Sequence, residues 1–241
     1  MTRLPVEICL SGATPAVLEA NLRAARDGGA RRVELCSRMG RQGLSPWPWQ
    51  LRLAAAMAGS LELVVMTRPQ EGFAASPELL ERMLHELERA AAAGAASVAL
   101  GVLQGKSLDL PAMRRLVNAA RGLGLLVTCH RAFDAVADQD EALDALVEMG
   151  VARLLSSGLA WPSGDPAGRE EALATLAAKT AGRLELVLAG GISAGTAPGL
   201  LRALPPAPCR FSLHAWSGVR RAGRTSAERV RSLVMVAHRP A

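Results

Sequence analysis

The sequence predicts one α/β domain over residues 1–241, an eight-stranded (β/α)8 barrel of the TIM type. Three observations predict it. Eight short apolar runs alternate with amphipathic stretches of helical period. Glycines stand between the end of several helices and the next apolar run, and the length fits one barrel with no linker left over. A doubly wound parallel sheet is the alternative, but it usually has fewer strands and does not close.

Each expected strand is a short, mostly apolar run bounded by turn residues. In chain order these runs are Val6–Leu10, Arg32–Cys36, Leu61–Thr67, Ser97–Gly101, Leu125–His130, Ala152–Ser156, Leu184–Ala189 and Arg210–His214. Helical periodicity between the runs is clear, for example, at Pro15–Arg26, Pro77–Ala93, Asp140–Met149 and Glu170–Ala181. This alternation requires parallel strands that are joined by helices.

Composition and charge exclude several classes of protein. Half of the residues are apolar and 21% are charged, which is ordinary for a globular protein, and no apolar run is long enough to span a bilayer. The net charge of +6 comes almost wholly from arginines that are interleaved with acids, without basic runs. We therefore expect neither nucleic-acid nor membrane binding.

The beginning of the chain and its cysteines favour a cytoplasmic location. The chain passes from Met1 straight into the first apolar run, so we expect no signal peptide. In the cytoplasm all four cysteines should stay reduced. They are Cys9, Cys36, Cys129 and Cys209.

The first two expected strands carry the same pattern, a glutamate followed two residues later by a cysteine: Glu7 with Cys9, and Glu34 with Cys36. Residues two apart on a strand point to the same side. A carboxylate in a buried strand is costly unless it is paired or opens onto a cleft. We therefore expect Glu7 and Glu34 to face each other inside the barrel mouth, with Arg68 or Arg131 pairing with at least one of them.

Polar residues also gather at most other expected strand ends, which is where barrel enzymes place their active sites. His130 ends the fifth expected strand and Asp134 follows in its loop. His130 could act as an acid or base near neutral pH, or it could hold Glu7 or Glu34 by hydrogen bonds. The candidate catalytic residues are Glu7, Glu34, Arg68, His130 and Asp134.

A candidate anion site is formed by Ser157, Gly158, Gly190 and Gly191, which follow the sixth and seventh expected strands. Loops at these positions of a barrel often bind phosphate through backbone N–H groups at a helix N-terminus. A glycine pair can equally be a tight turn. Three arginines after the eighth strand could make the mouth electropositive: Arg220, Arg221 and Arg224.

The thiols of Cys9 and Cys36 form a candidate metal site, because consecutive barrel strands lie about 4.8 Å apart. Two thiolates at that spacing could hold a soft ion such as Cu(I). Buried apolar filling is the alternative for a free cysteine, and it suits Cys129 and Cys209. The four-ligand spacing of a structural zinc site is lacking.

Over about residues 5–217 the chain resembles the CutC family, whose proteins are linked to copper homeostasis. The resemblance rests on the doubled Glu-x-Cys and on further motifs in the same order. These are Gly43-Leu44-Ser45-Pro46, Arg68-Pro69, Gly101-Val102-Leu103, Thr128-Cys129-His130-Arg131-Ala132-Phe133-Asp134, Leu155-Ser156-Ser157-Gly158, Ala189-Gly190-Gly191-Ile192 and His214.

The resemblance implies a cytosolic barrel, often a homodimer, in which Cys9 and Cys36 bind Cu(I). Three loops depart from the family pattern: Arg41-Gln42 replaces Glu-Gly, Gln70–Phe73 replaces an Arg-Gly-Gly-acid run, and Trp216 replaces a serine. Two functions remain open. One is a copper-homeostasis protein, and the other is an enzyme that acts on a small anionic or phosphorylated metabolite. No organic cofactor is evident in the sequence.

Overall fold

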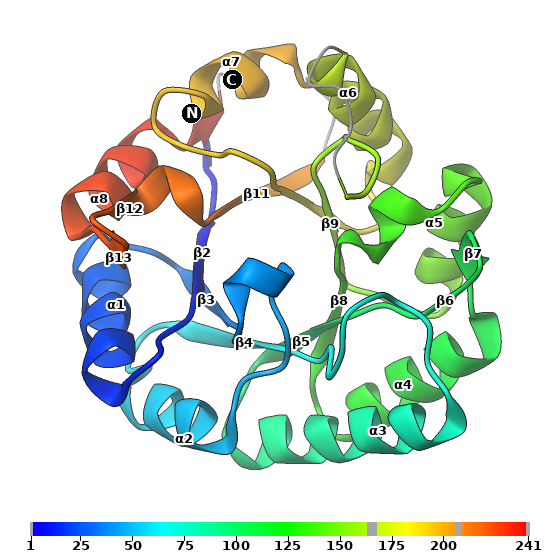
Figure 1. The fold of residues 1–241 in the computed structure, drawn as a ribbon. Coiled ribbons are helices and arrows are strands. Elements are labelled where there is room, and N and C mark those ends of the chain that lie inside the picture. Colours follow the sequence, from blue (N-terminus) through cyan, green and yellow to red (C-terminus); the bar gives the residue numbers. More distant parts are fainter. Residues whose placement is uncertain (1, 163–167, 206–208, 240–241) are drawn as a thin grey trace.

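Eight parallel strands close into a barrel in the computed structural model, which describes residues 2–162, 168–205 and 209–239 (Figure 1). The strands are β2 (Val6–Leu10), β3 (Arg32–Leu35), β4 (Glu62–Met66), β5 (Ser97–Leu100), β8 (Leu126–Cys129), β9 (Arg153–Ser156), β10 (Glu185–Leu188) and β11 (Arg210–Ala215). They follow one another around the barrel in chain order, and β11 pairs with β2. The predicted barrel is confirmed, and closure rules out the doubly wound sheet.

Helices cover the outside of the barrel between successive strands. They are α1 (Pro15–Asp27), α2 (Pro48–Met57), α3 (Pro77–Ala92), α4 (Leu110–Gly122), α5 (Gln139–Glu148), α6 (Arg169–Thr180), α7 (Ala197–Ala203) and α8 (Ala227–Val236). Proline stands in the first turn of α1 to α4, where the missing N–H costs nothing. Thr14, Ser76 and Asp109 accept hydrogen bonds from the free N–H groups at three of these N-termini.

Short strands and turns lie at both ends of the barrel. The end strands β1 (Thr2–Arg3) and β14 (His238–Arg239) pair with each other. The hairpins are β6 (Leu103–Gln104) with β7 (Ser107–Leu108), and β12 (Arg220–Arg221) with β13 (Arg224–Thr225). Three 3₁₀ turns, η1 (Met39–Arg41), η2 (Arg131–Ala135) and η3 (Ser217–Val219), follow β3, β8 and β11. All three turns lie at the mouth, where the strands end.

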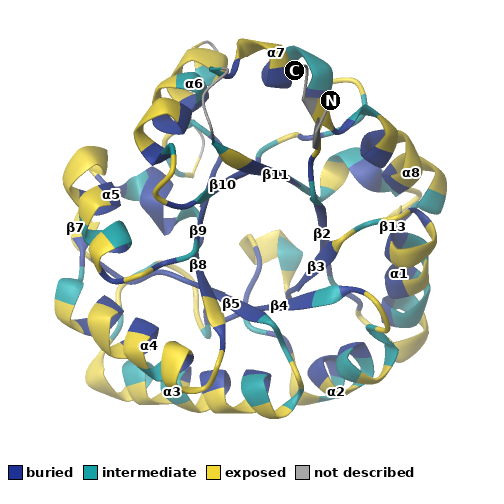
Figure 2. Cartoon of the chain, turned by 180° about the vertical axis from the view of Figure 1, so that it is seen from behind, coloured by how far each residue is buried: buried dark blue, intermediate teal, exposed yellow. Residues whose placement is uncertain are grey.

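Alternation along each strand divides apolar from polar residues. Ile8, Val33 and Leu35 belong to the main apolar core with the inner faces of the helices, whose outer faces are exposed (Figure 2). The residues between them, such as Glu7, Cys9 and Glu34, are also buried, but their partners lie across the barrel interior. Side chains alternate along a strand, so the apolar ones face the helices and the carboxylates and thiols between them face the barrel interior.

A network of charged residues fills the lower half of the barrel interior. Arg32 donates to Glu7 Oε2 at 3.1 Å, to Glu185 Oε1 at 2.7 Å and to Ser212 Oγ at 2.6 Å. Arg153 donates to Glu62 Oε1 at 2.6 Å and lies 3.5 Å from Glu185 Oε2. Each guanidinium therefore contacts two carboxylates from different strands, which ties the inner faces of the strands together.

Replacing Arg32 with methionine should destabilise the protein strongly. The change leaves Glu7 and Glu185 buried without their main cation, and breaking a buried pair costs about 3–5 kcal/mol. Urea unfolding followed by circular dichroism measures the loss. Arg114→Met is the matched control, because Arg114 pairs with Glu148 on the exposed surface. A loss for Arg32→Met no larger than that of the control would contradict the structural role of the network.

Candidate functional site

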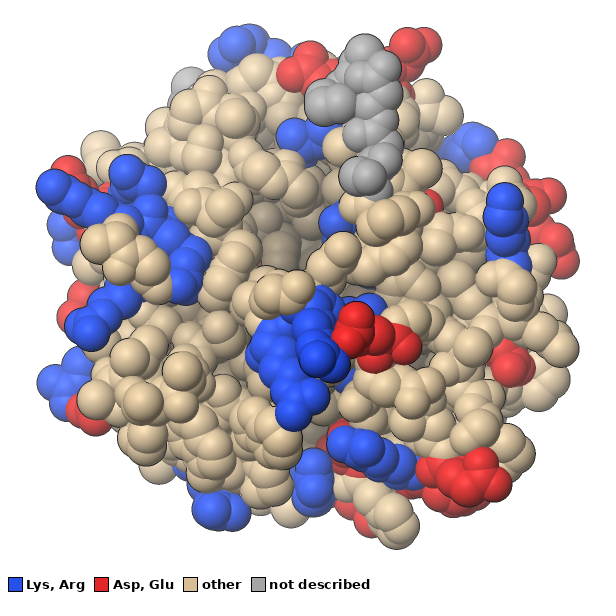
Figure 3. Space-filling view, viewed as in Figure 1, with Lys and Arg blue, Asp and Glu red and all other residues tan. Residues whose placement is uncertain are grey.

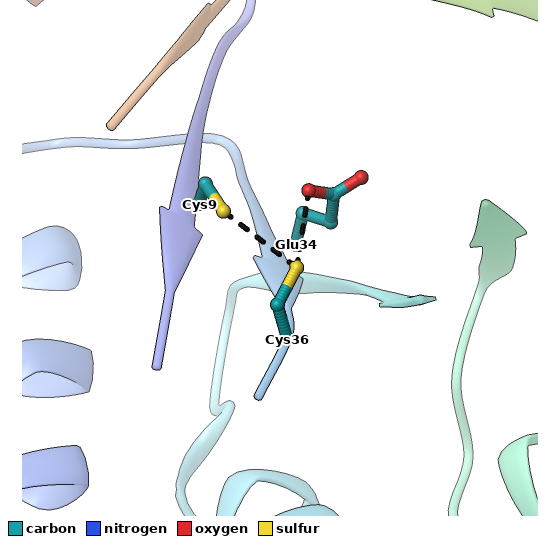
Figure 4. Close-up of side chains that lie close together, drawn as sticks. All are labelled: Cys9, Glu34 and Cys36. Carbon is teal, nitrogen blue, oxygen red and sulfur yellow. Dashed lines mark hydrogen bonds between the residues drawn. The ribbon is translucent and has the colours of Figure 1, made fainter. Parts of the chain in front are cut away.

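Three sulfur atoms and one carboxylate meet at the mouth end of β2 and β3. The Sγ atoms of Cys9 and Cys36 lie 3.6 Å apart, and Cys36 Sγ lies within hydrogen-bond distance of Glu34 Oε2, at 3.4 Å (Figure 4). Met39, in the turn η1 after β3, places its Sδ 3.8 Å from Cys9 Sγ. The separation of 3.6 Å shows that the two sulfurs are close together, as predicted. Both thiols are buried.

The two glutamates lie on either side of His214, which is near the end of β11. His214 Nδ1 lies 2.7 Å from Glu7 Oε1, and its Nε2 lies 3.8 Å from Glu34 Oε2. Glu7 also accepts the hydrogen bond from Arg32. Both carboxylates thus point into the barrel as expected, but the expected pairing with Arg68 or Arg131 is wrong: the cations that Glu7 contacts are Arg32 and His214.

The imidazole of His214 is charged at neutral pH. Burial alone would lower its pKa, but Glu34, Cys9 and Glu7 around it outweigh burial and raise the pKa well above its usual value. For Glu7, burial works toward a higher pKa, yet the hydrogen bond and charge of His214, with the charge of Arg32, lower it to about 2. Glu7 and His214 therefore form a buried ion pair.

Glu34 and the thiols differ in how readily they ionise. Burial raises the pKa of Glu34 to about 8, so at neutral pH this carboxyl is largely protonated. The hydrogen bond from Cys36 stabilises the Cys9 thiolate, and with the neighbouring His214 it lowers the pKa of Cys9 to about 6 despite burial. The pKa of Cys36 is raised well above its usual value, because its thiol donates to Cys9 and is buried. Cys9 is therefore the more readily ionised thiol of the two.

A cavity of about 360 Å³ opens above this cluster at the mouth of the barrel. Its floor is formed by Cys9, Cys36 and Glu34, and its rim includes Trp216 and Gly191. The view into the mouth shows a central hollow with basic residues on two sides, over the β12–β13 hairpin and over the segment that follows β3 (Figure 3). Basic side chains therefore lie at the entrance, including those over the hairpin that follows the last barrel strand.

Arg68 lines the cavity, and it contacts backbone carbonyls and aromatic rings. Its Nε donates to the carbonyl of Gly72, and its Nη1 donates to the carbonyls of residues 41–43. The guanidinium carbon lies 5.0 Å from the ring centroid of Phe73 and 5.7 Å from that of Trp161. Arg68 is 7% exposed. A buried cation therefore stands in the cavity wall.

His130 and Asp134 have local partners. His130 Nδ1 accepts the N–H of Ala132 at 3.2 Å, and burial with the charge of Arg68 lowers the pKa of His130 to about 3. His130 shows no hydrogen bond to either glutamate among the described residues, so the expectation that it holds one of them is wrong. Asp134 accepts from the hydroxyls of Ser156 and Ser157 and from Arg131, and it does not line the cavity.

Of the four residues predicted to bind an anion, Ser157 and Gly158 use their backbone N–H groups within the protein, whereas Gly190 and Gly191 line the cavity. The N–H of Ser157 donates to Asp134, and that of Gly158 donates to the Ser156 hydroxyl, so both donors are used within the protein. Gly190 and Gly191 line the cavity with φ angles of 79° and 65°, a conformation that favours glycine. The following helix α7 has only seven residues, so little helix dipole supports an anion there.

Sequence reasoning missed several residues of this site. Arg32 stands two residues before Glu34 on the same strand, so strand parity alone could have placed it inside the barrel. Met39 follows Cys36 by three residues, but only the turn η1 returns its sulfur to Cys9. Phe73 and Trp161 come from loops that are far apart in sequence, and no local pattern indicates that their rings meet.

Two groups of potential metal ligands occur among the described residues: Cys9, Glu34 and Cys36, and Glu7, Glu34 and His214. The second group is poorly suited to a metal, because Glu7 is occupied by Arg32 and the charged His214 has no free lone pair. The first group offers two sulfurs at the cavity floor. The donor set thus suits a soft ion better than a hard one.

The CutC family model matches residues 4–204 of this chain. The chain belongs to the CutC family. A CutC protein of Caulobacter vibrioides is 37% identical over 202 residues, which are 83% of this chain and 77% of that protein. A CutC protein of Vibrio parahaemolyticus is 37% identical over 184 residues, 76% of this chain and 73% of that protein. The resemblance seen in the motifs is confirmed over most of the chain.

Solved structures with this fold include CutC and aldolases. The crystal structure of CutC from Streptococcus agalactiae, which carries the description copper homeostasis protein, has a TM-score of 0.73 at 22% identity and covers 88% of this chain and 98% of its own. A deoxyribose phosphate aldolase from Aeropyrum pernix has a TM-score of 0.64 at 21% identity, over 95% of this chain and 88% of its own. At such identities the likeness extends to the fold. Within the described part of this CutC family member, none of the helices is long and apolar enough to cross a membrane.

Glu7→Gln should destabilise the folded protein at pH 7 by about 3 kcal/mol, because it leaves Arg32 and His214 without their shared carboxylate. The folded-state pKa of Glu7, about 2, lies below its ordinary value of 4.5. Its ionisation therefore stabilises the fold fully above the ordinary value, and this contribution is lost as the pH falls toward 2. Urea unfolding at several pH values should show the difference between the two proteins shrinking below pH 4.5. A difference that stays constant to pH 2 would exclude the ion pair.

Proposed function

We propose that this protein binds Cu(I) at the floor of the barrel mouth and handles copper in the cytoplasm. Cys9 and Cys36 supply two thiolate ligands, and Met39 supplies a thioether as the third. The observation that carries the proposal is the convergence of three sulfurs from β2, β3 and η1 at the bottom of one cavity. Membership of the CutC family supports the link to copper.

The sulfur separations suit a three-coordinate ion. With metal–sulfur bonds of about 2.3 Å, sulfurs lie roughly 4.0 Å apart in a trigonal site and about 4.6 Å apart in a linear one. Cys9 Sγ is 3.6 Å from Cys36 Sγ and 3.8 Å from Met39 Sδ. Only a small increase in these two separations would therefore be needed for an ion bound by Cys9 and its two sulfur neighbours.

The surroundings of the sulfurs favour a soft, monovalent ion. Val64, Met66 and Ala99 pack against the two cysteines, so the inner side of the cluster is apolar. Thiolate and thioether ligands select Cu(I) over Mg²⁺ or Ca²⁺, which require oxygen. The lowered pKa of Cys9 keeps a thiolate ready at neutral pH, so only Cys36 needs to release a proton on binding.

The Cys9→Ser/Cys36→Ser double variant should lose tight Cu(I) binding, because it removes both thiolates. Met39→Leu should weaken binding by about tenfold, as expected from the loss of one weak ligand worth about 1.4 kcal/mol. Titration against a chromogenic Cu(I) chelator under reducing conditions measures affinity and stoichiometry.

Cys209→Ser is the matched control, because Cys209 lies outside the cavity with its Sγ against the carbonyl of Ala177. It should bind Cu(I) as the original protein does. Unchanged copper stoichiometry in the double cysteine variant would eliminate the thiol site. Unchanged affinity in Met39→Leu would remove the thioether from the ligand set.

A second candidate function is catalysis on a small anionic metabolite. It is favoured by the size of the cavity, about 360 Å³, which greatly exceeds one ion, and by the pKa of Glu34, raised to about 8 beside the Cys9 thiolate. A protonated carboxyl and a thiolate side by side are a suitable acid and nucleophile. In that case Glu34 and Cys9 would be the reacting groups, with Arg68 in the wall binding the substrate.

Glu34→Gln separates the two functions. An enzyme should lose turnover by at least about 100-fold without its general acid, whereas Cu(I) bound by sulfur should be retained. Mass spectrometry of a mixture of small carboxylates and phosphate esters, incubated with each protein, detects any conversion. If the original protein converts none of these compounds, the enzyme proposal fails for these substrate classes.

A further inference from the structure

The part of the cavity wall that follows β4 carries a buried cation, Arg68, that forms no salt bridge with an acidic residue in the described part of the chain. Arg68 donates its Nε and Nη1 to backbone carbonyls, and no ion pair or hydrogen bond of its Nη2 occurs in the described part of the chain. The nearby Glu71 is exposed and pairs with Arg41 at 2.8 Å. Burial lowers the pKa of Arg68, but an arginine remains charged in proteins. A buried charge without a counter-ion calls for an anion from outside.

His130 adds an unused hydrogen-bond donor to the same wall. Because its Nδ1 accepts the Ala132 N–H, the proton of the neutral ring lies on Nε2. Nε2 is buried, has no hydrogen-bond partner, and belongs to a side chain that lines the cavity. His130 as a residue is 3% exposed. Leaving a buried N–H unpaired is unfavourable, and a bound acceptor would remove that cost.

Aromatic rings surround these two donors. The Phe73 ring lies 5.3 Å from that of His130 and 5.0 Å from that of Trp161, measured between centroids. The guanidinium carbon of Arg131 lies 4.9 Å from the Trp161 centroid. This wall offers apolar and flat surfaces beside a cation and an N–H donor. Such a combination fits an organic molecule better than a bare inorganic ion.

The charges around the cavity limit the charge of its occupant. Arg131 is neutralised by Asp134, and His214 by Glu7. Arg169 donates to the carbonyls of Ser157 and Ala189 and does not line the cavity. Arg68 therefore remains as the one arginine of the described lining without a salt-bridge partner, and a single such cation matches a monoanion better than a dianionic phosphate ester.

We propose that this wall binds a small organic monocarboxylate, with the carboxylate held by Arg68 and the Nε2–H of His130 and the body of the molecule against Phe73 and Trp161. The site deepens the proposed function, on which it rests for the role of the cavity, but it uses none of the copper ligands. Arg68, His130 and the sulfurs line one cavity of about 360 Å³, so Cu(I) and the carboxylate occupy it together.

Benzoate is a suitable probe, because it combines a carboxylate with a flat apolar ring. It should bind saturably, with a dissociation constant on the order of millimolar or below, as expected for a ligand of this size. Calorimetry measures the affinity, and the part of the tryptophan fluorescence change that is lost in Trp161→Phe reports contact with this wall, because Trp216 also lines the cavity. Benzyl alcohol, which lacks the charge, and acetate, which lacks the ring, should each bind at least about tenfold more weakly, a difference of about 1.4 kcal/mol.

Two variants remove one donor each and keep the local structure. Arg68→Gln retains an amide that can donate to the loop carbonyls, and His130→Asn retains an acceptor for the Ala132 N–H while it removes Nε2. Arg68→Gln should weaken benzoate binding by about tenfold or more, and His130→Asn by about fivefold. Arg114→Gln is the control for the loss of one positive charge, because Arg114 lies on the exposed surface with Glu148. It should bind benzoate as the original protein does.

Three results would overturn the proposal. They are equal benzoate affinity in Arg68→Gln and the original protein, equal affinity for benzoate and benzyl alcohol, and tighter binding of phenyl phosphate than of benzoate. The copper proposal is tested independently in the same proteins. Cys9→Ser/Cys36→Ser should bind benzoate normally while losing Cu(I), whereas Arg68→Gln should bind Cu(I) normally while losing benzoate.

Discussion

The guanidinium of Arg32 joins carboxylates from two strands in the charged network of the barrel interior. It lies between Glu7 and Glu185, and through Glu185 it is linked to Arg153 and Glu62 on the far side of the barrel. Because each partner comes from a different strand, the pairs can form only when the barrel closes in the observed register. Glu7 links this network to the mouth of the barrel, because one of its carboxylate oxygens contacts Arg32 and the other contacts His214. Arg32 therefore helps to fix the position and the charge of His214 through Glu7.

The pairing of charged groups in the interior changes along the barrel axis, from fully paired at the bottom to incompletely paired at the mouth. At the bottom, acids and arginines neutralise one another. In the middle, Glu7 and His214 form one more ion pair. At the mouth the compensation stops: Glu34 avoids charge by holding a proton, and Arg68 retains a charge that only backbone carbonyls and rings stabilise. Uncompensated groups stand where a ligand can reach them, as expected where stability is given up for function.

The alternation of apolar runs with amphipathic stretches was sufficient to predict the barrel. A buried parallel strand requires a near-continuous apolar run, and each helix that ends at a glycine returns the chain to the same edge of the sheet. The alternation of side chains along a strand likewise predicted that Glu7, Cys9, Glu34 and Cys36 point into the barrel interior. The partners of these residues could not be predicted, because they depend on which side chains meet across the barrel. Arg68 was expected to reach a glutamate, yet it is held by the carbonyls of the loop after β3, 25 and more residues away in sequence.

The charge of His214 also bears on which ion the sulfurs can hold. Its ring lowers the pKa of Cys9 and lies 3.8 Å from Glu34, so any cation at the sulfurs stands near a positive charge. The repulsion between two charges grows in proportion to their product, so a divalent ion experiences twice the repulsion of a monovalent one. A divalent ion such as Zn²⁺ also lacks a fourth strong ligand in this cluster, whereas Cu(I) is satisfied by soft sulfurs. Electrostatics and ligand number thus act in the same direction, and both favour a monovalent soft ion at Cys9 and Cys36.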